Sequence, residues 1–283
     1  MKERSAVAAR GPVGYNNTWI ETRRDVVTVI LCASVDNALL ELGLFEGEQL
    51  LLATEIGCDG TLTAVQYAVA IRSVLAFGQE PQGDLAGAIL SSVVPSVTEK
   101  LRQALALLTG RPPLVVGPGM RTGLNVRLDN ISSVGGDFIC CCIGALDQAP
   151  PPLVVANLGW VSTFSGLDPS GTFVGRSILP GVVACRDMLH QGAAQLPSVA
   201  LEGEAPLLGR STGEAIRSGL LHGYGAMLDG LAAQYEEQLG TGAQWILTGS
   251  NAPLLRPYCG QRWRHLPHLT LQGLCRLYRK NDR

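Results

Sequence analysis

The chain has 283 residues, of which 46% are hydrophobic and 16% are charged, so it can bury a sizeable core in one large domain or two ordinary ones. Its formal net charge of −2 argues against broad electrostatic binding to nucleic acid, which needs a basic face. No apolar run reaches the roughly 18 residues that a membrane-spanning helix requires, so no membrane partner is expected.

The cysteines indicate neither a metal site nor a disulfide framework. None of the eight belongs to a Cys-x-x-Cys pair, so we expect no structural zinc site. Residues 1–25 are polar and lack the apolar core of a signal peptide. We therefore expect a loosely ordered N-terminal tail over 1–25, reduced thiols and a cytoplasmic location.

The first half of the chain is predicted to open with three strands and then to alternate helices and strands. Short apolar and β-branched runs favour strands, and apolar residues at helical spacing favour helices. Pro95 leads into Ser96-x-x-Glu99, which has the pattern of a capping box. In order, we predict strands at 26–33, 39–45 and 49–53, a helix at 62–77, a strand at 83–93, a helix at 96–108 and a strand at 114–116.

A long central stretch, Gly117–Asp137, separates the two halves. It contains a Gly-Pro-Gly turn and few helix formers, and connections of this length are usually either functional or disordered. Apolar runs flank it on both sides. We interpret it as the wall of a site and Asp137 as its most informative residue.

The second half repeats the order of the first. We predict a helix at 138–146, strands at 153–156, 161–164 and 172–178, a helix at 181–190, a helical region opened by a capping box at Ser211–Glu214 and reaching 239, a strand at 244–248 and a closing helix at 269–278. Gly219, Gly223 and Gly225 argue against one uninterrupted helix in the long region.

The shared order indicates an internal duplication. We expect an α/β protein of two duplicated actin-like, sugar-kinase-like lobes with a cleft between them. The first lobe would span 26–148 and the second 149–283, and the closing helix 269–278 could pack back on the first.

Ten short segments then resemble type III pantothenate kinases, in the same order along the chain. They are GLFEG at 43–47, ILSSVVPSVT at 89–98, PPLVVGPGMRTGL at 112–124, DN at 129–130, VGGD at 134–137, ILPGV at 178–182, QLP at 195–197, STGEAIRSGLLHGY at 211–224, LTGSNAPLL at 247–255 and HLTLQGL at 268–274. The resemblance implies an actin-like fold, an obligate homodimer, and ATP-dependent phosphorylation of pantothenate, the first committed step to coenzyme A. It also implies ATP, Mg²⁺ and a monovalent cation, K⁺ or NH₄⁺.

The first phosphate loop departs from the family pattern Asp-x-Gly-Asn-Thr-Asn. Ser34 replaces the acid, Asp36 replaces the glycine, and only Asn37 is kept. Serine cannot neutralise Mg²⁺ as a carboxylate does. Asp36 adds bulk and negative charge where phosphate oxygens would lie, although it could also rescue metal binding from two residues away.

The second phosphate loop, Asp-x-Gly-Thr-Ala-Thr-Thr in the family, is also altered. Asn157 replaces the acid and Trp160 a small hydroxyl residue, whereas Gly159 and Thr163 remain and Ser162 stands beside them. The indole of Trp160 would either fill the nucleotide cleft or cap the core. Both interpretations argue against ordinary ATP binding, and no residue is assigned as a metal ligand.

Asp137 matches the family's general base for the pantothenate hydroxyl, and it is equally a candidate helix N-cap. The acceptor pocket implied by the resemblance is degenerate, since Phe138, Leu128 and Ala193 stand where the family has arginine, tyrosine and threonine. Gly175-Arg176 also replaces a Gly-Gly pair. The candidate acceptor residues are Gly117, Gly119, Arg121, Thr122, Gly123, Leu128, Gly135, Phe138 and Ala193.

Other candidate sites are weaker. The four histidines at 190, 222, 265 and 268 lack metal-ligand spacing and are expected at the surface or at helix caps. Arg262, Trp263 and Arg264 are expected in a solvated loop.

Three functions remain open. The preferred one is a pseudoenzyme of the pantothenate kinase family with little or no kinase activity, acting by interaction or regulation, as a homodimer or as a heterodimer with an active paralogue. The second is an active, divergent pantothenate kinase that uses Asp137 as base and Asp36 for metal binding. The third is a kinase-fold enzyme whose more apolar pocket accepts another small molecule.

Overall fold

The computed structural model describes residues 29–37, 39–77, 85–130 and 134–282. The expected tail at 1–25, the start of the first strand and Ala38 lie outside the described residues. Elements of the first half are β1 (Val29–Val35), β2 (Leu39–Glu46), β3 (Gln49–Gly57), α1 (Ala64–Phe77), β4 (Leu85–Ser92), α2 (Pro95–Thr109), β5 (Leu114–Val115) and α3 (Gly136–Gln148). None of the helices in the described part of the chain is long and apolar enough to cross a bilayer.

The second half repeats this succession, except that two helices, the second of them long, stand between its third and fourth strands where the first half has α1 alone. Its elements are β6 (Leu153–Leu158), β7 (Val161–Leu167), β8 (Phe173–Pro180), α4 (Val182–Gly192), α5 (Thr212–Leu239), β9 (Gln244–Thr248), α6 (Ala252–Leu255), the 3-10 helix η2 (Arg256–Tyr258), β10 (Trp263–His265) and α7 (Leu269–Asn281).

The two sheets confirm the predicted duplication. The first has the strand order β3-β2-β1-β4-β5 and the second β8-β7-β6-β9-β10, which is the same order in corresponding strands. In each, the first three strands pair antiparallel and the last two join in parallel. The protein is therefore built from two α/β lobes of one design.

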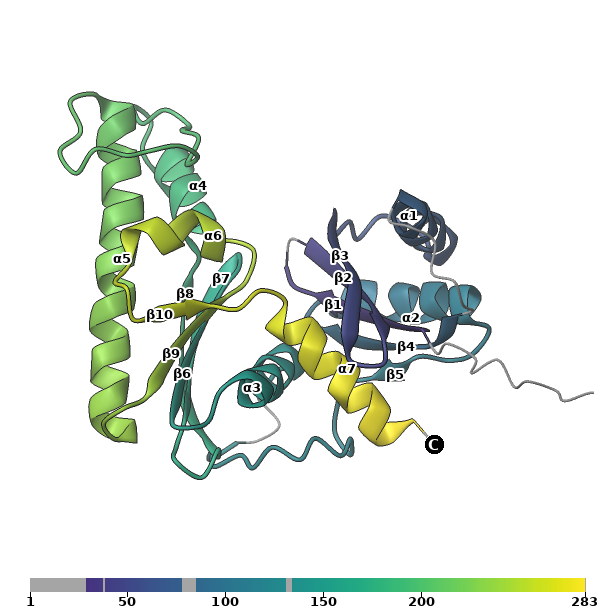
Figure 1. The fold of residues 1–283 in the computed structure, drawn as a ribbon. Helices are drawn as coiled ribbons and strands as arrows, with labels where there is room; N and C mark the ends of the chain where they lie inside the picture. Colours follow the sequence, from purple (N-terminus) through teal and green to yellow (C-terminus); the bar gives the residue numbers. More distant parts are fainter. Residues whose placement is uncertain (1–28, 38, 78–84, 131–133, 283) are drawn as a thin grey trace, which may run out of the picture.

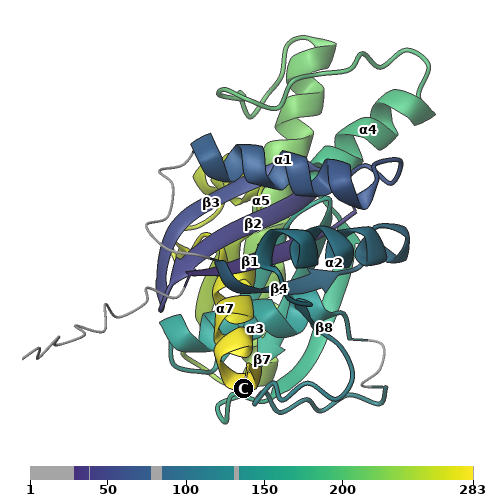
Figure 2. The same cartoon turned by 90° about the vertical axis from the view of Figure 1, so that its right-hand side faces the viewer.

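Both central strands are buried on two faces, as their apolar runs predict. In β1, Val29, Leu31 and Ala33 face α1 and α2, whereas Ile30 and Cys32 face the helices between the sheets. Strand β6 alternates in the same way between these central helices and α5. Figure 1 shows α3 and α7 between the two lobes, and Figure 2 shows α1 and α2 covering the outer face of the first sheet.

The central helices α3 and α7 pack closely because glycines lie at their contact. A side chain at Gly144 of α3 would overlap the carbonyl oxygen of Leu269, and one at Gly273 of α7 would overlap that of Cys140. Helix α7 also packs on β1, β2 and β4, and α3 packs on β4, β6 and β7. One core cluster therefore joins both sheets through these two helices.

Three local predictions were wrong or incomplete. Ser96 does not cap α2, because Pro95 already begins the helix after an extended Val94, and Glu99 instead pairs with Arg102. The capping box at Ser211 is confirmed by a hydrogen bond from the Glu214 amide, and α5 is one helix despite its glycines. Trp263 is 2% exposed within β10 rather than part of a solvated loop.

Candidate active-site cleft

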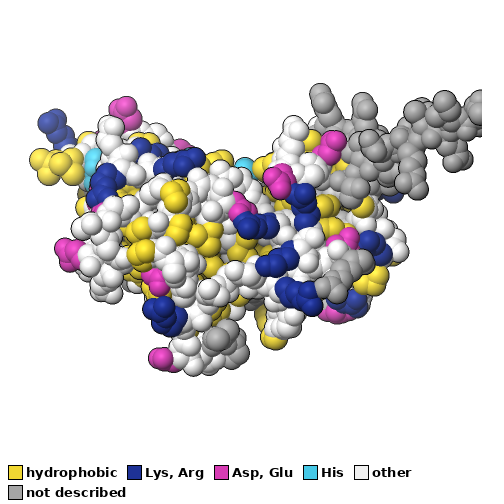
Figure 3. All heavy atoms as spheres, turned by 60° about the horizontal axis from the view of Figure 1, so that its bottom comes forward, with side chains coloured by type: hydrophobic (Ala, Val, Ile, Leu, Met, Phe, Trp, Pro, Cys, Tyr) yellow, Lys and Arg dark blue, Asp and Glu magenta, His cyan; other side chains and the backbone are white. Residues whose placement is uncertain are grey.

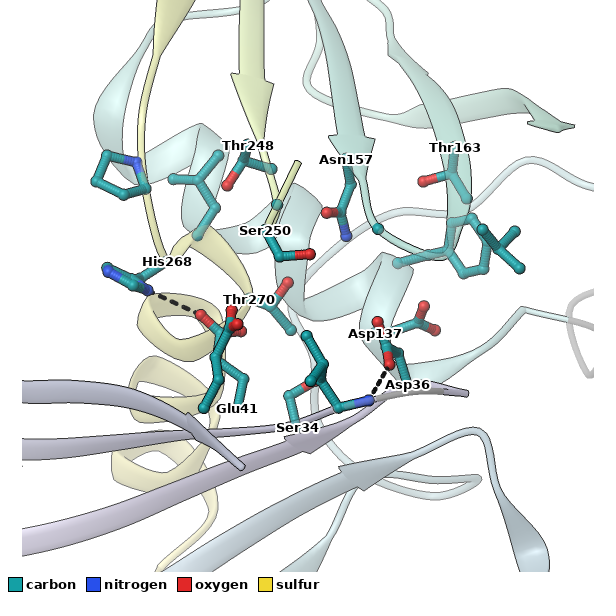
Figure 4. A pocket seen from close by; sticks show the side chains of 18 of the residues that line it. Ser34, Asp36, Glu41, Asp137, Asn157, Thr163, Thr248, Ser250, His268 and Thr270 are labelled. Carbon is teal, nitrogen blue, oxygen red and sulfur yellow. Dashed lines mark hydrogen bonds and ion pairs between the residues drawn. The ribbon is translucent and has the colours of Figure 1, made fainter. Parts of the chain in front are cut away.

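A cleft of about 410 Å³ lies between the lobes, at the carboxyl ends of β1, β6 and β9 and the first turns of α3 and α7. Figure 4 shows its polar side chains pointing toward one another from both lobes. Of the residues predicted for phosphate or acceptor binding, eight line it: Ser34, Asp36, Asn37, Asn157, Gly159, Thr163, Asp137 and Phe138. The structure thus brings the two altered loops and the retained acid together.

The first loop is closed by the aspartate that replaces the family's glycine. The Asp36 amide donates to the Leu39 carbonyl at 3.0 Å, and the Leu39 amide donates to Asp36 Oδ1 at 2.7 Å. The other carboxylate oxygen points across the cleft, since a Cβ built on Gly159 would lie 3.2 Å from Asp36 Oδ2. Asp36 therefore occupies the space in which the two loops face each other.

The second loop is braced by the segment after β9. The Asn251 side chain donates to the Gly159 carbonyl at 3.0 Å, and its backbone amide donates to the Leu158 carbonyl at 2.8 Å. Gly249 has φ +95°, and a side chain there would crowd Asn157 Oδ1. Asn251 therefore holds the backbone of this loop at Leu158 and Gly159, directly after the neutral Asn157.

The retained acid, Asp137, lies in the first turn of α3, and Gly135 rather than Asp137 occupies the N-cap position. The predicted N-cap role is wrong for this reason. A side chain at Gly135 would overlap Asp137 Oδ1, and one at Gly136 would come within 2.8 Å of Val116 and 2.9 Å of Ser91. Both glycines of the VGGD segment thus make room, the first for the carboxylate and the second for the contact of α3 with the first lobe.

Burial raises the pKa of Asp137 above its ordinary value, and the negative charge of Asp36 adds to this rise. The backbone amides of residues 138 and 137 and the positive charge of Arg176 lower the pKa, but burial dominates. Asp137 Oδ1 is buried and makes no hydrogen bond with the described residues. An acid held in this way is suited to accepting a proton from a nearby hydroxyl.

A second cluster of polar side chains, contributed by both lobes, lines the other end of the cleft. His268, at the start of α7, contacts Glu41 of β2 at 2.8 Å, and this contact raises the pKa of His268. Burial, and then the charges of Glu41 and Asp36, raise the pKa of Glu55. Burial lowers the pKa of His265. His268 thus lies at a helix start, as expected, and joins the two lobes.

Four carboxyl groups, those of Asp36, Glu41, Glu55 and Asp137, line the cleft. The described residues contribute no lysine or arginine to this lining. Phosphate groups in proteins are usually met by lysine, arginine, backbone amides or metal ions. The charge of this cleft therefore opposes direct binding of an anionic phosphate chain.

Most of the central stretch lies away from the cleft. Arg121 exchanges hydrogen bonds with Asn281 at the C-terminal end of α7, at 3.0 and 3.1 Å, and a side chain on Gly123 would overlap Lys280. Further along, Arg127 and Val126 pair with Phe173 of β8. Figure 3 shows the face on which α7 ends, with basic and acidic side chains interspersed. The stretch thus connects the lobes, and the expectation that all of it walls the site is wrong.

The remaining candidate acceptor residues do not line the cleft either. They are Gly117, Gly119, Arg121, Thr122, Gly123, Leu128, Gly135 and Ala193. Leu128 packs on the central core, and Ala193 ends α4.

Ser162 and Trp160 lie outside the cleft as well. Ser162 is buried, and on β7 it alternates with Thr163, which faces the cleft. Trp160 is 37% exposed and lines a separate surface groove with α4. The predictions that Trp160 fills the nucleotide cleft or caps the core are therefore wrong.

Several cleft residues were missed by sequence reasoning: Glu41, Glu55, Thr248, Gly249, Ser250, His265, His268 and Thr270. Thr248 and Ser250 could have been found, because β9 was predicted correctly and its carboxyl end belongs at the same sheet edge as that of β6. Glu41 and His268 could not, since their contact joins residues 227 positions apart.

The described residues hold no group of three or more His, Cys, Asp or Glu side chains arranged to bind a metal ion. Asp36 and Asp137 are nevertheless at the same end of the cleft (Figure 4), and Mg²⁺ commonly uses one or two carboxylates together with substrate phosphates. These two acids are therefore the residues that fit Mg²⁺ by their chemistry.

Comparison with known proteins agrees with this architecture. The family model for type III pantothenate kinase matches residues 30–234. The type III pantothenate kinase of Moorella thermoacetica (strain ATCC 39073 / JCM 9320) is 30% identical over 253 residues, which cover 89% of this chain and 100% of that protein.

Two solved structures show the fold. The activator of the 2-hydroxyisocaproyl-CoA dehydratase from Clostridium difficile with bound ADPNP has a TM-score of 0.53 at 8% identity, over 89% of this chain and 94% of that one. A ROK family glucokinase from Streptomyces griseus, in complex with glucose and AMPPNP, has a TM-score of 0.50 at 12% identity, over 89% of this chain and 100% of that one. The fold is thus that of the actin-like, sugar-kinase-like ATPases, and the chain belongs to the type III pantothenate kinase family.

Proposed function

We propose that this family member is a pseudoenzyme, with lost or strongly reduced ATP-dependent phosphorylation of pantothenate. The observation that carries the proposal is the position of Asp36, whose carboxylate lies between the two phosphate loops and beside Gly159. The lost acids at Ser34 and Asn157 remove metal ligands, while Asp36 adds a negative charge at the point where a phosphate would approach.

The electrostatic balance supports this proposal. Two unit charges about 4 Å apart interact by about 4 kcal/mol at an effective dielectric constant of about 20. Repulsion of this size between Asp36 and a phosphate would have to be offset by a metal ion or by basic side chains. No lysine or arginine among the described residues lines the cleft to do so.

The test restores the family pattern in this chain. Wild type and the triple variant Ser34→Asp, Asp36→Gly, Asn157→Asp are compared for thermal stabilisation by ATP with Mg²⁺ and for phosphorylation of pantothenate with K⁺. We expect no measurable activity from wild type and a gain of ATP-dependent stabilisation in the variant. Phosphorylation by wild type that is lost in Asp137→Asn would contradict the proposal.

A divergent active kinase is the second candidate, and it is favoured by the presence of Asp36 and Asp137 at one end of the cleft. The single variant Asp36→Gly separates the two candidates by the sign of its effect. If Asp36 obstructs phosphate, its removal strengthens ATP binding. If Asp36 holds Mg²⁺, its removal abolishes whatever activity wild type shows.

We further propose that the protein acts in the cytoplasm through dimerisation, either with itself or with an active paralogue. Membership of the family supports this, since the resemblance implies a homodimer, and the intact core clusters indicate that the fold is kept although the loop acids are lost. Light scattering of the purified chain, and co-purification after co-expression with an active type III pantothenate kinase, test the two assemblies. A monomer that recovers no paralogue would overturn this part.

A further inference from the structure

Two separate departures from the family pattern meet in space. Phe138 replaces the arginine that follows the retained acid, and Arg176 replaces a glycine on β8, 38 positions along the chain. In the structure, the guanidinium of Arg176 lies over the ring of Phe138, 4.3 Å from its centroid. The positive charge missing from α3 is thus supplied from the opposite lobe.

The strand geometry brings Arg176 to the cleft side of the second sheet. Ile178, two residues further along β8, lines the cleft, and side chains two positions apart share one face of a strand. Arg176 is opposite Ser165 in the β7–β8 register, and Ile178 is opposite Thr163, which also lines the cleft. Phe138 itself lines the cleft, and the guanidinium of Arg176, which is not one of the lining residues, lies next to this lining through its stack on the Phe138 ring.

The electrostatic environment agrees with this placement. The charge of Arg176 is close enough to act on Asp137, whose pKa it lowers against the larger effect of burial. Stacking on an aromatic ring engages the face of a guanidinium, whereas a bidentate pair with a carboxylate engages its edge, so both can occur together. The ring of Phe138 would therefore orient the guanidinium rather than block it.

We propose that Arg176, oriented by Phe138, is the carboxylate-binding residue of this cleft, and that the cleft binds a small organic acid. The size of the cleft, about 410 Å³, suits a small molecule. Asp137, beside the stack, would meet a hydroxyl of the same ligand. This inference concerns binding alone, so it stands whether or not phosphoryl transfer survives.

The test measures ligand binding without ATP. Pantothenate is the carboxylate probe, and pantothenyl alcohol, which has a hydroxyl in place of the carboxylate, is its matched control. We expect pantothenate at millimolar concentration to raise the unfolding temperature of wild type and the alcohol to leave it unchanged. Equal shifts with the two probes, or no shift with either, would overturn the proposal.

Single variants test whether Arg176 is the residue that binds the pantothenate carboxylate. Arg176→Gly should weaken pantothenate binding by about tenfold or more, the scale of one lost charge-assisted hydrogen bond. Arg127→Ala is the control, because this arginine has a side chain 74% exposed and pairs with Asp168 away from the cleft. Wild-type affinity in Arg176→Gly would contradict the assignment.

A double variant distinguishes the loss of a ligand contact from the loss of folding. Phe138→Arg combined with Arg176→Gly returns the charge to α3, and we expect it to recover pantothenate binding relative to Arg176→Gly alone. A double variant that folds, as judged by circular dichroism, but fails to recover binding would show that Arg176 acts only by supporting the structure around Asp137.

Discussion

Asp137 is held in its cleft at the expense of stability. Its Oδ1 atom is buried without a hydrogen bond among the described residues, and burial raises its pKa. A raised carboxyl pKa means that the folded state binds the proton more tightly than the unfolded state does. The stability contributed by that proton is fully present below the unfolded-state pKa and is lost as the pH rises through the folded-state pKa.

We therefore predict that Asp137→Asn is more stable than wild type at neutral pH, by an amount of the order of 1 kcal/mol. The reason is that the amide cannot ionise and needs no proton to be buried. Urea unfolding at about pH 7 and about pH 4 measures the difference, which should shrink at the lower pH because the wild-type carboxyl is then protonated. A variant less stable than wild type at neutral pH would show that the charged carboxylate is stabilised by its neighbours.

Four glycines in the body of α5 separate into two kinds. Those at Gly219, Gly223 and Gly230 face open space, whereas a side chain at Gly225 would overlap the carbonyl oxygen of Tyr258. Only the last therefore has a packing reason to be glycine. The first three lower the stability of an otherwise regular 28-residue helix.

Gly219→Ala is expected to stabilise the protein by about 0.5–1 kcal/mol, because alanine loses less backbone entropy in a helix. Gly225→Ala is the matched contrast and should destabilise it, since α5 and η2 would have to separate. Denaturant midpoints of the two variants test this pair, and a shift of the same sign in both would contradict the packing argument.

The contact between α7 and β2 through His268 and Glu41 predicts a pH dependence. The hydrogen bond to Glu41 raises the pKa of His268, so the folded state holds this proton more tightly. The contribution is therefore complete below the unfolded-state pKa and is lost as pH rises through the folded-state pKa. Glu41→Gln should lower the free energy of unfolding by up to about 1 kcal/mol at about pH 6 and change it little at about pH 9. An equal loss at both pH values would point to packing instead.

The order of elements could be predicted from sequence because it depends on short-range patterns. The apolar alternation and turn residues located β9 at 244–248 and the start of α7 at Leu269 correctly. The same patterns misled at Ser96, where Pro95 had already begun the helix. A capping motif therefore predicts the start of a helix reliably only where no neighbouring residue can itself begin the helix.

The site was only partly predictable, because the arrangement of its side chains depends on contacts between the two lobes. The substitution of glycine by Asp36 was visible in the sequence, but the approach of its Oδ2 to Gly159 depends on how the two sheets face each other. Phe138 was interpreted as a lost charge, and the guanidinium of Arg176 that stacks on it comes from a strand in the other half. Spacing along the chain carries no information about such pairs.

At the scale of the whole molecule, the two lobes share one core. Gly144 and Gly273 allow α3 and α7 to touch between the sheets, and residues of both sheets belong to the same cluster. Gly144→Ala is therefore predicted to destabilise the whole protein by about 1–3 kcal/mol, as overpacking of a core does. Tryptophan fluorescence, to which the buried Trp245 and Trp263 of the second lobe contribute among the four tryptophans of the chain, and far-ultraviolet circular dichroism should give one common midpoint. Separate midpoints would show that the lobes unfold independently.

The packing of α7 against the first sheet also affects the order in which the protein can fold during synthesis. Strands β1, β2 and β4 leave the ribosome early, but the helix that covers their inner face ends at Asn281. Until then, apolar side chains such as Ile30 and Phe45 have no complete cover from the chain itself. The inner face of the first sheet therefore stays partly uncovered during synthesis until the residues of α7 have been made, and exposed apolar surface of this kind favours aggregation of a nascent chain.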